Sequence, residues 1–173
     1  MEKPKGLADR IETWMKKIPG VRSYKEREQR RETDKKLREH LASRLQDSRS
    51  RLKKIAQDLS AKNQLESLAK LDRFSSRLQQ MADTIRYASY GYSGIFDLDK
   101  IREEELDRLY NFDLQLVEHL EKIQKGVEEV GQASSAFARE KKVEEAEAVL
   151  DALESQFNRR KELITSSVPD PKT

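Results

Sequence analysis

The stretch from Val21 to Leu59, which contains no Gly or Pro, constrains the fold most. Apolar residues recur in its second half at the spacing that places them on one side of a helix. They are Leu37, Leu41, Leu45, Leu52, Ile55 and Leu59, with Ser48 taking one apolar place. We therefore expect one long amphipathic helix here, about 60 Å in length at about 1.5 Å per residue.

Three later segments repeat this pattern. Their apolar stripes run from Leu65 to Ile85, from Ile101 to Val130 and from Val143 to Ile164. Asn63 is placed to cap the first of these helices, so we expect a break near residues 60–63, with one continuous bent helix as the alternative. Asp97 is expected to cap the next helix.

The composition suits long helices that each bury one narrow apolar stripe, which we call a seam, better than it suits a thick hydrophobic core. Charged residues make up 39% of the chain and hydrophobic residues 35%, with a mean hydropathy of −0.93. The 6 Gly and 4 Pro are too few for an all-β fold. The prediction is an all-α antiparallel bundle of three or four long helices over residues 21–165. A short amphipathic helix at residues 1–20 precedes it, and a flexible tail at residues 166–173 follows.

The N-terminal helix has an apolar face with basic residues beside it. Ile11 and Trp14 lie on that face, Lys16 and Lys17 flank it, and Pro19-Gly20 ends the helix. Two interpretations stay open, because the same pattern suits docking onto the bundle and lying in a membrane surface. In the second, these four residues contact a membrane or a partner.

An aromatic and glycine-rich segment connects the second and third apolar stripes. In a chain that is 6% aromatic, it gathers Tyr87, Tyr90, Gly91, Tyr92, Gly94, Phe96 and Asp97. We expect a turn in which one or both glycines take positive φ. The two rings nearest the helix ends, Tyr87 and Phe96, are expected to be buried. Tyr90 and Tyr92, nearer the tip, are expected to be exposed and to contact a partner.

The sequence offers few residues for catalysis or metal binding. It contains no Cys, and its two His, His40 and His119, each directly follow a Glu instead of lying three residues after one. Adjacent residues point about 100° apart on a helix, so neither pair matches the Glu-x-x-His motif of di-metal bundles. We expect no catalytic residue, metal or cofactor, and a protein that is not an enzyme.

Charge is distributed unevenly along the chain. The first third is basic and the remainder acidic, although the net charge is only +3. The basic stretch Arg22–Arg38 suits a nucleic-acid phosphate backbone. It is interrupted by acidic residues at helical pairing distance, which favours a self-paired, solvated face.

Three segments carry a resemblance to a known family. They are residues 18–31 (Ile-Pro-Gly-Val-Arg-Ser-Tyr-Lys-Glu-Arg-Glu-Gln-Arg-Arg), residues 37–42 (Leu-Arg-Glu-His-Leu-Ala) and residues 87–94 (Tyr-Ala-Ser-Tyr-Gly-Tyr-Ser-Gly). They resemble a family of uncharacterised bacterial all-helical proteins, over roughly residues 6–130. That resemblance implies a link to membrane-stress systems of the band-7/flotillin and phage-shock kinds, and so a scaffold or adaptor at the membrane surface. It offers no catalytic residues.

Together these features predict a non-enzymatic helical scaffold or adaptor that binds a protein partner or itself, in the cytoplasm or at the inner face of a membrane. No apolar run approaches the roughly 20 residues needed to span a bilayer. The alternative is a nucleic-acid-associated helical protein that uses the basic Arg22–Arg38 face. No small-molecule substrate is evident.

Overall fold

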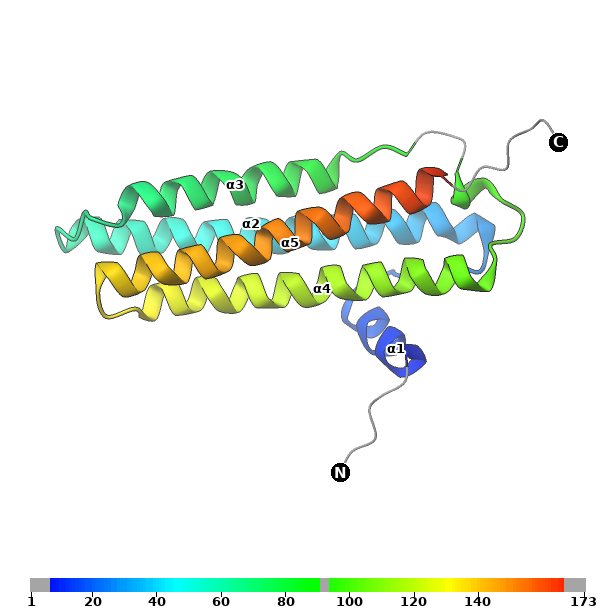
Figure 1. Ribbon diagram of the computed structural model, residues 1–173, viewed down its shortest axis with the longest axis horizontal. Helices are drawn as coiled ribbons and strands as arrows, with labels where there is room; N and C mark the ends of the chain where they lie inside the picture. The colour runs from blue at the N-terminus through cyan, green and yellow to red at the C-terminus, as the bar shows by residue number, and fades with distance from the viewer. Residues whose placement is uncertain (1–6, 91–93, 167–173) are drawn as a thin grey trace, which may run out of the picture.

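The computed structural model describes residues 7–90 and 94–166, and this part of the chain contains helices and no strands. Its elements are α1 (Leu7–Lys17), α2 (Arg27–Ala61), α3 (Leu68–Arg86), η1 (Ile95–Asp97), α4 (Glu103–Gln132) and α5 (Ala136–Ser166). The four long helices α2 to α5 form an up-down-up-down bundle, and α1 lies outside it, across α4 (Figure 1). The predicted helical bundle is confirmed.

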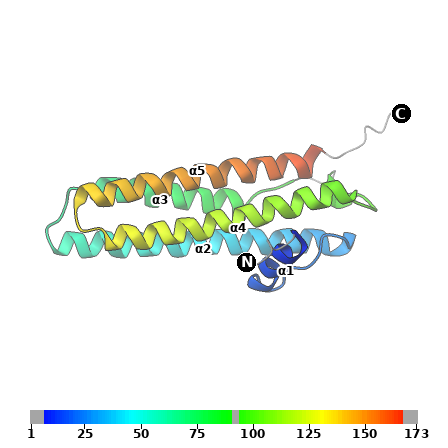
Figure 2. The same ribbon diagram turned by 60° about the horizontal axis from the view of Figure 1, so that its bottom comes forward.

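Packing within the bundle follows the order α2, α3, α5, α4. The contacting pairs are α2 with α3, α3 with α5, α5 with α4, and α4 with α2 (Figure 2). The apolar stripes of these helices meet at the centre, where residues such as Leu41, Leu78, Leu116 and Leu153 have no exposed surface. The seams are therefore covered within one chain, and their apolar content does not by itself call for a second subunit.

Helix α2 begins six residues later than its sequence pattern predicts. Residues 21–26 are not helical, because tertiary hydrogen bonds hold them in another conformation. Tyr24 N donates to the Tyr110 hydroxyl at 2.9 Å, and Arg30 donates to the carbonyl oxygens of Tyr24 and Lys25. These bonds occupy backbone groups that a longer helix would have used for itself.

The predicted break after α2 is confirmed, but the role expected for Asn63 is wrong. Asn63 has φ +57°, its N–H donates to Ser60 O, and the N–H of Gln64 donates to Leu59 O. This pair of bonds is a Schellman ending, so Asn63 terminates α2 instead of capping α3. Helix α3 begins only at Leu68, and Leu65, expected in its seam, is exposed in the connection.

The N-terminus of α4 also differs from the expectation. Asp97 does not cap it: the helix begins at Glu103, and Asp97 lies in η1, where it pairs with Arg31 at 2.8 Å. Residues 98–102 form an irregular connection whose Leu98 carbonyl accepts a hydrogen bond from Arg30. The carbonyl contact and the ion pair together bind this connection to α2.

Helix α1 docks onto the bundle, which is the first of the two interpretations of its sequence. Trp14 is 1% exposed and Ile18 2% exposed, and Trp14 lies beside Leu114 and Val117 of α4. Gly20, with φ +82°, turns the chain after the helix. Trp14 is thus part of the core, and it is not a residue that a membrane or a partner can contact.

Candidate functional site: a buried charge network and two surface recesses

Arg160 of α5 is at the centre of a buried charge network at the α2 N-terminal end of the bundle. Its side chain is 0% exposed. Nε donates to Asp113 Oδ1 of α4 at 2.5 Å, and Nη1 donates to Asp34 Oδ1 of α2 at 2.6 Å. One guanidinium therefore ties together three of the four long helices.

Two tyrosines and a second arginine complete this network. Tyr24 donates its hydroxyl proton to Asp113 Oδ2 at 2.6 Å, and its oxygen accepts from Arg160 Nη2 at 3.0 Å. The Tyr90 hydroxyl accepts from Arg160 Nη1 at 3.1 Å. Arg38 Nε donates to Asp34 Oδ2 at 2.8 Å. Two arginines thus balance two aspartates, and every carboxylate oxygen has a donor, as burial of charge requires.

Burial and neighbouring charges fix the protonation of these groups. Burial raises the pKa of Tyr24 well above its ordinary value and raises the pKa of Tyr90 to about 12. Burial also raises the pKa of Asp113, against the opposing effect of Arg160. Burial alone would lower the pKa of Arg160, but Asp113, Tyr24 and Asp34 raise it well above its ordinary value. At neutral pH both phenols keep their protons and Arg160 keeps its charge.

Aromatic rings pack around the network. Tyr24 stacks on Phe96 with ring centroids 5.9 Å apart and contacts Tyr110 at 5.4 Å. Tyr90 meets Phe96 edge-on at 6.1 Å, and the Arg38 guanidinium lies 5.6 Å from the centre of the Tyr90 ring. These contacts keep water from the charged groups and fix the segment 87–90 to α2.

Phe96, Tyr87 and Tyr90 differ in how much of each side chain is exposed. Phe96 is 3% exposed, as predicted. Tyr87 is 75% exposed, so its predicted burial is wrong. Tyr90 is half-buried and hydrogen-bonded to Arg160, so its predicted exposure is wrong too. The reason is that Tyr87 ends α3 on its outer side, whereas the polar network needs the Tyr90 hydroxyl.

Gly94 is the glycine of this segment that the structure describes. Gly94 has φ −180°, which is extended backbone and needs no glycine. Its hydrogen is required for another reason: a Cβ at this position would lie 2.5 Å from Ile164 O. The sequence predicts positive φ at one of the two glycines or at both, and Gly94 does not adopt it, which excludes only the second option. Gly91 and Tyr92 lie outside the described residues.

The remaining predicted contact residues of α1 are distributed over both faces. Ile11 is half-buried against the core, Lys16 is exposed, and Lys17 pairs with Glu121 of α4 at 2.6 Å. With Trp14 buried, the apolar face of α1 faces the bundle. The face that an in-plane membrane helix would insert is therefore occupied.

Most arginines of the basic stretch are engaged within the chain. Arg30 is buried, Arg27 pairs with Asp99 at 2.6 Å, and Arg31 and Arg38 pair with Asp97 and Asp34. Arg27, Arg30 and Arg31 fasten α2 to residues 97–99, whereas Arg38 pairs within α2 and donates to the Arg86 carbonyl oxygen at the end of α3. They are correspondingly less available for phosphates.

A small recess lies beside the network. It measures about 290 Å³ and is lined by Arg31, Asp34, Arg38, Ala88, Ser89, Tyr90 and Phe96. The exposed Tyr87 directly precedes three of these residues in the chain. This part of the bundle, which we call the Tyr/Gly end, comprises residues 87–90 and 94–97. It presents the exposed Tyr87 ring next to the recess.

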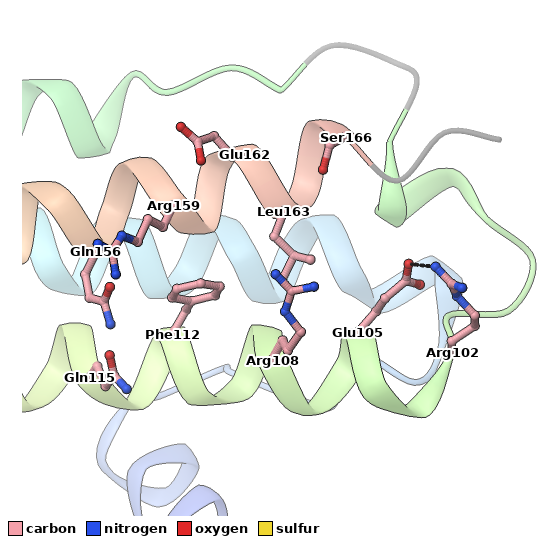
Figure 3. A pocket seen from close by; sticks show the side chains of 10 residues that line it. All are labelled: Arg102, Glu105, Arg108, Phe112, Gln115, Gln156, Arg159, Glu162, Leu163 and Ser166. Atoms are coloured by element: carbon pink, nitrogen blue, oxygen red, sulfur yellow. Dashed lines mark hydrogen bonds and ion pairs between the residues drawn. The ribbon is translucent and has the colours of Figure 1, made fainter. Parts of the chain in front are cut away.

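A larger recess, which we call the α4–α5 groove, has a volume of about 820 Å³ (Figure 3). Its lining residues are Arg102, Glu105, Arg108, Phe112, Gln115, Gln156, Arg159, Glu162, Leu163 and Ser166. Arg102 pairs with Glu105 at 2.5 Å. That hydrogen bond, with a smaller contribution from Arg108, lowers the pKa of Glu105.

Sequence reasoning missed Arg160, Asp113 and Asp34, although a signal was present. Asp34 lies three residues before Leu37, Asp113 four after Leu109, and Arg160 three after Phe157. Each charged residue thus occupies a seam position of its helix, where an apolar residue is the rule. Opposite charges at seam positions of three helices are the pattern that predicts a buried network.

Among residues 7–90 and 94–166, no group of three or more His, Cys, Asp or Glu could hold a metal ion. Within the same residues, no helix is both long and apolar enough to cross a membrane. No family model, curated protein or solved structure matches the chain. The family resemblance of the sequence therefore stays a prediction.

Proposed function

We propose that this protein is a helical adaptor that binds a protein partner through the Tyr/Gly end of its bundle. The observation that carries the proposal is Tyr87, whose side chain is 75% exposed beside the recess of about 290 Å³. Exposed tyrosine is favoured at protein interfaces because its ring offers a large contact area and its hydroxyl a polar contact.

The packing behind Tyr87 supports this proposal. Arg38 donates a hydrogen bond to Arg86 O at 2.9 Å, and Tyr90 is held by Arg160 and Phe96. The segment is therefore ordered before a partner arrives, which reduces the entropic cost of binding. A partner side chain that enters the recess would contact Tyr90 and Phe96, while Tyr87 contacts the surface of the partner.

Two related predictions concern nucleic-acid binding and the location of the protein in the cell. Nucleic-acid binding by Arg22–Arg38 loses support, because several of its arginines are buried or paired within the chain. A cytoplasmic location, with or without a membrane-surface contact, stays a prediction from the sequence. If such a contact exists, its residues do not include the buried Trp14.

Tagged protein purified from cells that naturally produce it would test the proposal. The co-purified proteins are quantified for the native chain, for Tyr87→Ser and for Phe137→Ser. Phe137, 82% exposed at the start of α5, is the matched control at the opposite end of the bundle. We expect the recovered amount of one partner protein to fall about tenfold with Tyr87→Ser and to be unchanged with Phe137→Ser. Both variants should keep the Tm of the native chain. Equal recovery from both variants would contradict the proposal.

A further inference from the structure

The α4–α5 groove carries two arginines that pair with no residue in the described part of the chain. Arg108 of α4 and Arg159 of α5 are exposed, and neither makes a hydrogen bond or ion pair with any residue of 7–90 or 94–166. Of the two acidic lining residues, Glu105 is engaged by Arg102, and the Glu162 side chain lies on the side of α5 away from α4 in Figure 3.

On other faces of the bundle, basic side chains form ion pairs across helix–helix boundaries. Arg51 of α2 pairs with Glu128 of α4, and Lys70 and Arg77 of α3 pair with acidic residues of α5. Basic side chains next to a helix–helix boundary thus generally find a partner across it. Arg108 and Arg159 have no such partner among residues 7–90 and 94–166, although Glu105 and Glu162 each lie three residues from one of them in the chain. Both guanidinium groups can therefore bind an external anion.

The shape of the groove favours a chain segment over a compact molecule. It runs along α4 from Arg102 to Gln115, about 20 Å at about 1.5 Å per residue. An extended peptide of about six residues spans the same length at about 3.3 Å per residue. Small ligands usually bind in concave sites that bury most of their surface, whereas this groove lies open along two helices.

The lining residues between the two arginines can hold such a segment. The Phe112 ring lies between Arg108 and Arg159 in Figure 3, with Leu163 of α5 nearby. Phe112 is half-buried, so part of its ring can contact an apolar side chain. Gln115 and Gln156 offer amides that can both donate to and accept from a peptide backbone.

We propose that the α4–α5 groove binds an acidic peptide segment of a partner protein. The segment carries an apolar side chain that packs on Phe112 and carboxylates that bind Arg108 and Arg159. Guanidinium groups hold carboxylates through paired hydrogen bonds. This inference builds on the proposed adaptor function, because it supplies a second contact surface distinct from the Tyr87 end.

Fluorescence anisotropy with a defined probe tests this inference. The probe is a fluorescein-labelled hexapeptide with one central Leu and Glu or Asp elsewhere, and the control peptide has Gln and Asn in their place. Protein variants are Arg108→Gln, Arg159→Gln and Arg73→Gln. Arg73 is the matched control, since it is exposed on α3 and makes no hydrogen bond or ion pair within the described residues.

We expect saturable binding of the acidic probe, weakened about tenfold by either groove substitution and less than twofold by Arg73→Gln, because one such charge-assisted contact corresponds to about a factor of ten. Phe112→Ala should weaken binding of the Leu probe more than that of a Gly-centred acidic probe. Tyr87→Ser should leave probe binding unchanged, which separates a failure here from a failure of the Tyr87 proposal.

Four outcomes would overturn the inference. The first is that the probe shows no saturable binding, and the second is that Arg73→Gln weakens its binding as much as the groove substitutions do. The third is that millimolar inorganic phosphate displaces the probe and binds as tightly as the probe itself. The first two leave only general electrostatics, and the third indicates a small-anion site. The fourth is self-association in sedimentation that is lost with Arg159→Gln, which would assign the groove to a second copy of the chain.

Discussion

Replacing Arg160 with Met removes every donor that the central guanidinium supplies to the buried network. Asp113 Oδ1 loses its donor, and Asp113 keeps only the Tyr24 hydroxyl. Asp34 still receives Arg38, so Asp113 accounts for most of the penalty. Breaking a buried ion pair on one side costs about 3–5 kcal/mol. We expect a loss of about 4 kcal/mol in unfolding free energy, or roughly 8–16 °C in Tm for a chain of this size.

The pH dependence of this loss has a definite sign. Arg160 opposes the rise that burial gives to the pKa of Asp113, so the pKa rises further in the folded variant. A group whose pKa is raised by folding favours the folded state at low pH and loses that contribution as pH rises. The deficit of the Arg160→Met variant should therefore be largest near neutral pH and shrink as the pH falls toward the raised pKa of Asp113.

Urea unfolding followed by far-UV circular dichroism measures both quantities. The matched control is Arg77→Met, which removes an exposed cross-helix pair with Asp151 and should cost at most about 1 kcal/mol. If Arg160→Met costs no more than Arg77→Met, or if its deficit does not shrink as the pH is lowered, the charge network does not stabilise the bundle through Arg160 and Asp113.

Three further outcomes are expected from the same unfolding assay. Trp14→Ala should lower the unfolding free energy by about 3–5 kcal/mol, because Trp14 is 1% exposed; a change below about 1 kcal/mol would show that α1 is separable. Gly94→Ala should destabilise by about 1–3 kcal/mol through contact with Ile164 O, and a neutral result would contradict that approach. Burial lowers the pKa of His40 and of His119, so stability should fall as pH drops below about 6.5; the double His→Gln variant should show a weaker fall, and an unchanged slope would refute this assignment.

The helices could be predicted from the sequence because their apolar stripes are long and regular. Leu41, Leu116 and Leu153 each belong to an apolar stripe of a different helix. All three are buried, as the helical spacing of their stripes predicts. Helix ends were less predictable, because tertiary contacts decide them. The bond from Tyr24 N to the Tyr110 hydroxyl joins residues 86 positions apart, and no local pattern reveals it.

The candidate site was predictable only in part. The sequence singles out the Tyr/Gly segment, and the structure places Tyr90 and Phe96 of that segment next to the charge network. The assignment of buried and exposed rings was wrong for Tyr87 and Tyr90, because it considered distance from the helix ends and not the polar partners of each hydroxyl. Asp113 and Arg160 were overlooked since they lie far apart in sequence, although both interrupt an apolar seam.

Site-specific photo-crosslinking in the cells that naturally produce the protein tests most directly whether the Tyr87 end binds a partner. A photoreactive phenylalanine derivative replaces Tyr87 in one variant and Phe137 in another, because both side chains are highly exposed at opposite ends of the bundle. We expect a discrete cross-linked species from position 87 that is absent from position 137. No cross-linked species at position 87, or the same species at both positions, would contradict partner binding at this end.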